Sequence, residues 1–178
     1  MPLREVNGVR LMVEESGSGD TVVLVHGSWD DRQVWTLIEE DLAKRSRVVS
    51  YDRRGHTGSD DGSDPGTRRD DEDDLASLIE TLGVAPANVV GSSFGASIAL
   101  GLATRRPELF RTLCAHEPPL LSLAADDPLV MEVREAIGPV LELIRATFAA
   151  VATDFINADN SGLSATLENR LLCTGLLP

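Results

Sequence analysis

The stretch that decides the fold is Asn88-Val89-Val90-Gly91-Ser92-Ser93-Phe94-Gly95-Ala96, in which a short apolar strand runs into a helix without an intervening loop. We expect the strand over residues 88–90 and the helix, rich in Ala and Leu, over residues 93–105. A chain that turns this abruptly leaves its central residue strained and exposed at the carboxyl end of the strand. Residues two before and two after the centre would collide unless they are small, which explains the two glycines around Ser93.

Outward from this junction, strands alternate with helices. A hairpin is expected over residues 3–13, because Asn7-Gly8 favours a tight turn between alternating apolar residues. Further strands are expected at 21–25, 47–51 and 111–115, and further helices at 31–44 and 70–82, with a polar loop over 52–67. This order predicts an α/β fold with a mostly parallel sheet and helices on both faces.

The chain is expected to divide into two segments of different character. Residues 1–120 would form the α/β core. After Pro118-Pro119, residues 121–178 would form a helical, lid-like segment, with one or two helices over 128–156, followed by an irregular tail. Within the core, the helix over 31–44 would pack through the apolar face that Val34, Leu37, Ile38 and Leu42 share.

Composition excludes several classes of protein. The net charge of −13 argues against nucleic acid as a partner, because phosphate binding needs a basic surface. Lys44 is the only lysine, which excludes a lysine-rich patch for anionic membranes, and the apolar runs are too short to span a bilayer. We expect no signal peptide at the amino end. Cys114 and Cys173 lack metal-ligand spacing and fit a reduced, cytoplasmic setting, with Cys114 a small core residue.

The acidic run Asp70-Asp71-Glu72-Asp73-Asp74 could suggest a metal site, but its position favours another interpretation. Acidic side chains stabilise the first turn of a helix, where the helix dipole is positive. We therefore expect this run to begin the helix over 70–82, with its remaining carboxylates facing water, and we expect no metal.

Ser93 is the candidate nucleophile, because the turn exposes its hydroxyl at the end of the sheet. The helix that follows directs backbone N–H groups at developing negative charge, so the N–H of Phe94 is one candidate oxyanion donor. The loop His26-Gly27-Ser28-Trp29 follows a buried strand and can supply the second donor, with the N–H of Ser28 the first choice and that of Trp29 the second. His26 itself is expected to brace the turn rather than transfer protons.

Four motifs resemble those of the α/β-hydrolase superfamily, in its small serine esterase-like or peroxidase-like branch. In chain order they are His26-Gly27-Ser28-Trp29, Tyr51-Asp52-Arg53-Arg54-Gly55-His56-Thr57-Gly58-Ser59, Gly91-Ser92-Ser93-Phe94-Gly95-Ala96 and Ala115-His116-Glu117-Pro118-Pro119. The resemblance implies acyl transfer to water from a small ester, lactone or amide-like substrate, without a cofactor. Serine at position 93 argues against the haloalkane-dehalogenase and epoxide-hydrolase branches, in which the nucleophile is a carboxylate.

The resemblance also implies a catalytic acid and a histidine after the nucleophile. The chain has three histidines, and only His116 follows Ser93. Three hypotheses follow: a hydrolase truncated before the strands that carry the acid and the histidine, a short non-catalytic remnant or binding protein, or a chain in which His116 or His56 replaces the base, with Glu117 as its orienting group. Glu117 could equally form a structural turn. Without later strands, the strand over 111–115 would be an exposed sheet edge, which predicts a homodimer.

Overall fold

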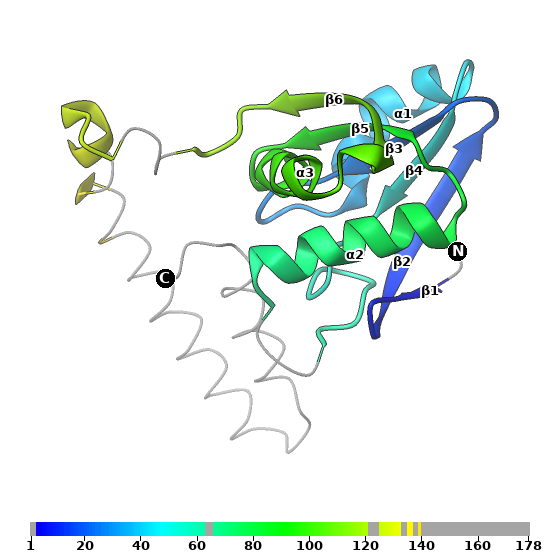
Figure 1. The fold of residues 1–178 in the computed structure, drawn as a ribbon, viewed down its shortest axis with the longest axis horizontal. Coiled ribbons are helices and arrows are strands. Elements are labelled where there is room, and N and C mark those ends of the chain that lie inside the picture. Colours follow the sequence, from blue (N-terminus) through cyan, green and yellow to red (C-terminus); the bar gives the residue numbers. More distant parts are fainter. Residues whose placement is uncertain (1–2, 63–65, 121–124, 133–134, 137–138, 140–178) are drawn as a thin grey trace.

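The computed structural model describes residues 3–62, 66–120, 125–132, 135–136 and 139. Its core is a six-stranded sheet in the order β1-β2-β4-β3-β5-β6 (Figure 1). Strand β2 pairs antiparallel with β1 and with β4, and the other neighbouring strands pair in parallel. The strands are β1 (Leu3–Val6), β2 (Val9–Gly17), β3 (Thr21–Val25), β4 (Arg47–Tyr51), β5 (Ala87–Ser92) and β6 (Phe110–His116).

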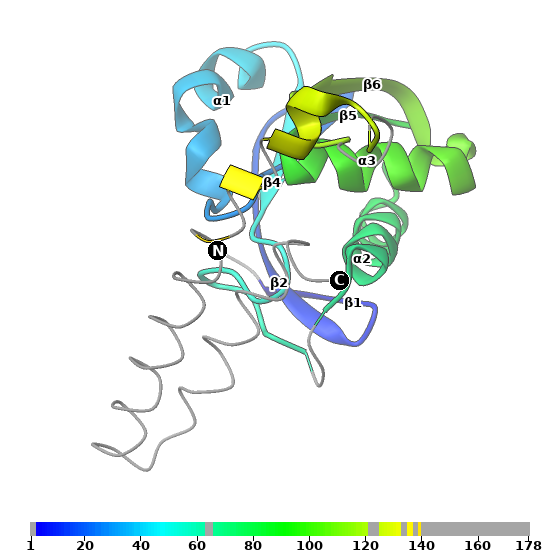
Figure 2. The same ribbon diagram turned by 90° about the vertical axis from the view of Figure 1, so that its left-hand side faces the viewer.

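Helices cover the sheet unequally on its two faces. The helices are α1 (Thr36–Ala43), α2 (Arg68–Thr81) and α3 (Phe94–Arg105), with short 3₁₀ turns η1 (Arg32–Trp35) and η2 (Pro107–Leu109). Figure 2 shows α1 on one side of the sheet and both α2 and α3 on the other. The predicted α/β architecture is confirmed, with each predicted strand found within a few residues of its expected bounds.

The larger apolar core lies between the sheet and the pair α2–α3. It includes Val23, Val49 and Val89 from the strands and Leu78 and Ile98 from the helices. On the α1 side, the buried cluster consists of Leu24, Trp35 and Val48, with half-buried neighbours around it. Trp35 is therefore part of the core on this side of the sheet.

The predicted packing face of the helix over 31–44 is wrong. Leu37 is 94% exposed, Val34 47% and Ile38 43%, and only Leu42 packs against the buried cluster. The physical reason is that the segment begins as the 3₁₀ turn η1, whose tighter winding changes the direction of successive side chains and turns Trp35 toward the sheet. The outer face of α1 is left uncovered by the described residues.

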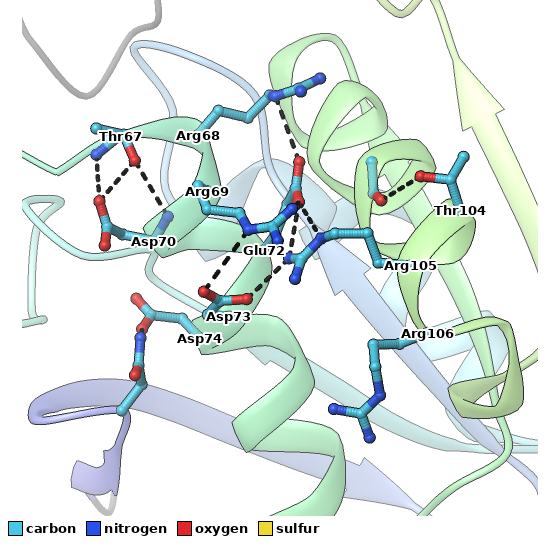
Figure 3. A network of polar contacts seen from close by, with 12 residues as sticks. Thr67, Arg68, Arg69, Asp70, Glu72, Asp73, Asp74, Thr104, Arg105 and Arg106 are labelled. Atoms are coloured by element: carbon cyan, nitrogen blue, oxygen red, sulfur yellow. Dashed lines mark hydrogen bonds and ion pairs between the residues drawn. The ribbon is translucent and has the colours of Figure 1, made fainter.

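The acidic run also departs from expectation, because Asp71, Glu72 and Asp74 are buried rather than solvated. Arginines lie beside all three: Arg53 pairs with Asp71 and Arg54 with Asp74, both from the loop after β4. Glu72 lies among Arg68, Arg69 and Arg105, at 3.3, 3.5 and 2.8 Å, in the network between α2 and α3 (Figure 3). Helix α2 begins two residues before the predicted start, and Thr67 and Asp70 form a reciprocal capping box there. In the described part of the chain, no acidic cluster has a geometry that could hold a metal ion.

Strand β6 is paired with β5 and has no second neighbour among the described strands. Cys114, predicted to be a core residue, is exposed. A core position needs cover on that face of the sheet, whereas β6 forms the edge and its face on the α1 side is open. The predicted dimer through this edge stays a prediction.

The predicted segment 121–178 falls mostly outside the described residues. Of it, residues 125–132, 135–136 and 139 are described, and Asp127 caps a helical turn there by accepting hydrogen bonds from the N–H groups of Leu129 and Val130. No helix in the described ranges is both long and apolar enough to cross a lipid bilayer.

Candidate active site

The junction between β5 and α3 has the strained geometry that the sequence predicts. Ser93 has φ 51° and ψ −121°, a backbone conformation that residues other than glycine rarely adopt. A methyl group at Gly91 would lie 2.6 Å from the Cα of Ala96, and one at Gly95 would overlap the carbonyl of Val25 and lie 2.5 Å from that of His26. Both glycines are therefore required for α3 to start this close to β3 and β5.

Helix α3 begins at Phe94, directly after Ser93. The carbonyl of Ser93 accepts hydrogen bonds from the N–H groups of Ala96 and Ser97, at 3.0 and 3.3 Å, whereas the hydroxyl of Ser93 makes no capping bond. The first N–H groups of a helix have no acceptor within the helix. The N–H of Phe94 is therefore one of these groups, directly after Ser93.

The turn after β3 lies against Ser93. Strands β3 and β5 pair in register through Val25 and Gly91, and a Cβ atom built on Gly27 would lie 3.0 Å from that of Ser93. Ser28 is half-buried in this turn, while Trp29 has a φ of 67° and a side chain that is 55% exposed. The two segments that the sequence singled out, 26–29 and 91–95, are therefore neighbours at the same sheet edge.

His26 is fully buried, and both of its ring nitrogens are engaged. Its Nε2 accepts a hydrogen bond from the backbone N–H of Arg53 at 3.0 Å. The ring proton is therefore on Nδ1, which donates a hydrogen bond to the Gly27 carbonyl at 2.9 Å. Burial, with the nearby Arg53 and His56 in support, holds the pKa of His26 well below its ordinary value. A neutral, fully bonded imidazole braces the turn, as the sequence led us to expect.

His56 is buried beside His26, with the ring centroids 4.9 Å apart. Its Nδ1 lies 2.8 Å from the Arg54 carbonyl and its Nε2 lies 3.0 Å from the guanidinium of Arg53. Because an arginine can only donate, Nε2 is the acceptor and its lone pair is occupied. This geometry argues against His56 as the base for Ser93.

His116 lies at the end of β6, opposite Ser92 in the ladder with β5. Its carbonyl accepts a hydrogen bond from the N–H of Ser93 at 2.8 Å, and its side chain is exposed. Glu117 follows with a φ of 50°. The edge thus carries Trp29, Ser93 and Glu117, each with positive φ, at the ends of three neighbouring strands.

Sequence reasoning missed the residue at the centre of this region. Arg53 is fully buried and contacts the Gly27 carbonyl, His56 and Asp71 through its guanidinium, at 3.3, 3.0 and 3.1 Å. The one available signal was an arginine two residues after a buried strand. Its partners could not be identified, because Asp71 lies on another element.

Comparison with known proteins shows which family the chain belongs to. The model of the alpha/beta hydrolase family matches residues 22–172. An uncharacterized hydrolase, YraK, from Bacillus subtilis is 38% identical over 67% of this chain and 45% of its own length, and the 2-hydroxymuconate semialdehyde hydrolase of Pseudomonas sp. is 36% identical over 60% of this chain and 39% of its own. The chain therefore spans about half the length of these relatives or less.

Solved structures show the same fold. A variant of an epoxide hydrolase from Bacillus megaterium superposes with a TM-score of 0.63 and 28% identity, over 66% of this chain and 42% of the other. With the family model covering most of its residues, the chain belongs to the alpha/beta hydrolase family.

Proposed function

We propose that this chain carries the nucleophile and oxyanion hole of a serine hydrolase that transfers an acyl group from a small ester, lactone or amide-like substrate to water. The observation that carries the proposal is the strained Ser93, held between the amino end of α3 and the turn at Gly27. Strain of this kind persists only where the surrounding structure enforces it, and it concentrates at functional sites.

In the proposed reaction, the Oγ of Ser93 forms a bond to the substrate's acyl carbon, and the carbonyl electrons move to its oxygen. The N–H groups of Phe94 and Ser28 stabilise this oxyanion. The serine proton passes to a base and then to the leaving alcohol or amine, and water repeats the sequence to release the acid. No cofactor enters these steps.

The relatives act on different bonds, and position 93 separates them. The similar solved structures include epoxide hydrolases, which by the resemblance use a carboxylate as the nucleophile. A serine hydroxyl suits acyl transfer instead. We therefore propose that this chain belongs with the serine-dependent, acyl-transferring members of the family rather than with the epoxide hydrolases.

A non-catalytic remnant or binding protein is the second candidate. The observation that favours it is that both buried histidines, His26 and His56, are committed to hydrogen bonds within the fold. His116 is then the one histidine of this chain left as the base, with Glu117 as its orienting group. A serine without a base is a poor nucleophile.

We also propose a reduced, cytoplasmic setting, with the exposed Cys114 as a free thiol.

The test is to treat the protein with a serine-directed fluorophosphonate and, separately, with a chromogenic short-chain ester. Intact mass and peptide mapping locate the label. Ser93→Ala is the test variant, and Ser92→Ala, one residue earlier and half-buried, is the matched control. The proposal expects labelling that Ser93→Ala abolishes and Ser92→Ala retains.

His116→Ala then separates the candidates. Ester turnover that is lost in both Ser93→Ala and His116→Ala assigns the base to His116. Labelling without turnover, unchanged in His116→Ala, indicates that the nucleophile site is formed but the base is not in this chain. If the protein shows no labelling and no turnover, the result favours the non-catalytic protein.

A further inference from the structure

We propose that Arg53 is a positioning residue that fixes the orientation of the Gly27–Ser28 peptide, and with it the direction of the Ser28 N–H in the oxyanion hole. The inference rests on the proposed function, because it gives that N–H its role. The Arg53 side chain acts through its contacts with the Gly27 carbonyl and the Phe94 ring.

The Gly27 carbonyl has two donors. The Arg53 Nη2 lies 3.3 Å from it and the His26 Nδ1 lies 2.9 Å from it. The peptide that joins Gly27 to Ser28 is planar and trans, so its C=O and N–H point in opposite directions. Holding the carbonyl toward Arg53 therefore holds the Ser28 N–H away from it. Reversing this peptide would direct a carbonyl oxygen, not a donor, at the developing oxyanion.

Arg53 also contacts the other half of the oxyanion hole. Its guanidinium carbon lies 5.1 Å from the centre of the Phe94 ring, within the range of a cation–π contact. Phe94 supplies the second proposed donor from its backbone. One guanidinium thus packs behind both segments that carry the donors, the turn at Gly27 and the start of α3.

The guanidinium is itself fixed in place. Its Nη1 donates to the carboxylate of Asp71 on α2 at 3.1 Å, and both side chains are almost completely buried. The side chain is fully buried, and its Nη1 and Nη2 are directed at these protein acceptors. Rotating Arg53 away from Gly27 would break its contacts with Asp71 and His56 as well.

The part played by the side chain can be separated from that of the backbone. The bond from the Arg53 N–H to His26 does not depend on the side chain, so a substitution at 53 leaves His26 held at Nε2. What is lost is the second donor to the Gly27 carbonyl and the contact with Phe94. The expected effect is a turn that remains folded but no longer holds one peptide orientation.

The test replaces the buried ion pair as a unit. Arg53→Met with Asp71→Leu removes both charges, which avoids leaving an unpaired buried carboxylate and is compatible with a folded protein. The matched control is Arg54→Met with Asp74→Leu. That pair is also buried, with side chains 9% and 1% exposed, and it joins the same loop to the same helix. Among the described residues, its bonds do not include the turn at Gly27.

Two measurements are made on each protein: the crystal structure around residues 26–29, and the second-order rate of Ser93 labelling by the fluorophosphonate. We expect the Gly27–Ser28 peptide to be flipped or present in two orientations in the test variant and unchanged in the control. We expect labelling to slow about 10- to 100-fold in the test variant, less than the loss of a whole oxyanion donor, and less than about 2-fold in the control.

An unchanged peptide and an unchanged labelling rate in the test variant would overturn the proposal. If the wild-type protein is not labelled at all, the proposed function fails, and the peptide orientation alone still decides the role of Arg53. If the double variant does not fold, Arg53→Lys takes its place. A lysine keeps the charge opposite Asp71 but cannot also reach the Gly27 carbonyl, so the same change in the peptide is expected.

Discussion

The two faces of the sheet differ in how deeply they are buried, although the strand residues that point to each face are similarly apolar. Val89 and Val90 are adjacent and identical, yet Val89 is 1% exposed beneath α3 whereas Val90 is only half-buried on the α1 side. The α2–α3 face also buries ion pairs, such as Arg53–Asp71 and Arg54–Asp74. The α1 face has a small buried cluster beside a helix whose outer side chains are exposed (Figure 2).

This difference teaches that strand sequence alone does not determine burial. A strand alternates its side chains between the faces, so each face is buried only as far as the elements that cover it extend. The site lies at the carboxyl edge of the sheet, and its supports, Arg53 and Asp71, are on the covered side. The covered face should therefore respond strongly to substitution, and the open face weakly.

The largest effect is expected for Leu78→Ala in α2. Leu78 is fully buried in the larger core, and truncation of such a leucine costs about 2–5 kcal/mol of unfolding free energy. Leu37→Ala in α1 is the matched variant, at 94% exposure, and should change stability by less than about 0.5 kcal/mol. Urea unfolding of both variants measures the difference. Similar losses at the two positions would refute the asymmetry of the faces.

A somewhat smaller effect is expected for Gly101→Ala, between α2 and α3. A methyl group there would overlap the carboxylate of Glu72, which the arginines around it hold in place. Overpacking of this kind costs about 1–3 kcal/mol, although alanine is the better helix former by about 1 kcal/mol.

The control is the same change in a Glu72→Ala background. Space is then available, so Gly101→Ala should become neutral or stabilising, and the double-mutant cycle measures the coupling. An equal cost in both backgrounds would show that contact with Glu72 is not the cause.

The third prediction concerns pH. Burial raises the pKa of Asp71 to about 6 against the opposing effect of Arg53, with Asp74 and Asp70 adding to the rise and Arg54 opposing it. Between about pH 4 and 6 the folded state therefore binds more protons at Asp71 than the unfolded state does. Its contribution to stability is greatest at low pH and falls as pH rises, by up to about 1.4 kcal/mol per pH unit.

The measurement is the free energy of unfolding of wild type minus that of Asp71→Asn, followed from pH 4 to 7. We expect the difference to decline with rising pH. Asp60→Asn is the control of opposite sign, since hydrogen bonds from Arg10 lower the pKa of Asp60 and its contribution is lost as pH falls. A difference curve for Asp71 that rises with pH would contradict the assignment.

The features that could be predicted from the sequence are those encoded locally. The β5–α3 junction is one, because the strain at Ser93 and the clash of a side chain at Gly91 with Ala96 arise within the segment itself. The clash at Gly95, by contrast, is with Val25 and His26. The hairpin at Asn7-Gly8 is another. Neighbouring strands then bring residues 26–29 to Ser93 through the parallel order of the sheet.

The features that could not be predicted depend on partners far along the chain. The carboxylates of Asp71 and Glu72 are buried because Arg53 and Arg105 reach them, and no local pattern identifies such pairs. The outward face of α1 could not be foreseen either, because an amphipathic pattern indicates an apolar face but not what covers it.

The smallest change in stability, and the last test of the comparison, is expected at the edge strand β6. Cys114 is exposed on the open side, so Cys114→Lys should alter the free energy of unfolding by less than about 0.5 kcal/mol. Unpaired strand edges associate, and lysine on an edge opposes it. We expect wild type to form a dimer in light scattering under reducing conditions and Cys114→Lys to be a monomer. Leu37→Lys tests the apolar side of α1 as the alternative interface. If this variant dissociates the dimer and Cys114→Lys does not, the interface is α1 and not the edge strand. A monomeric wild type would rule out both interfaces.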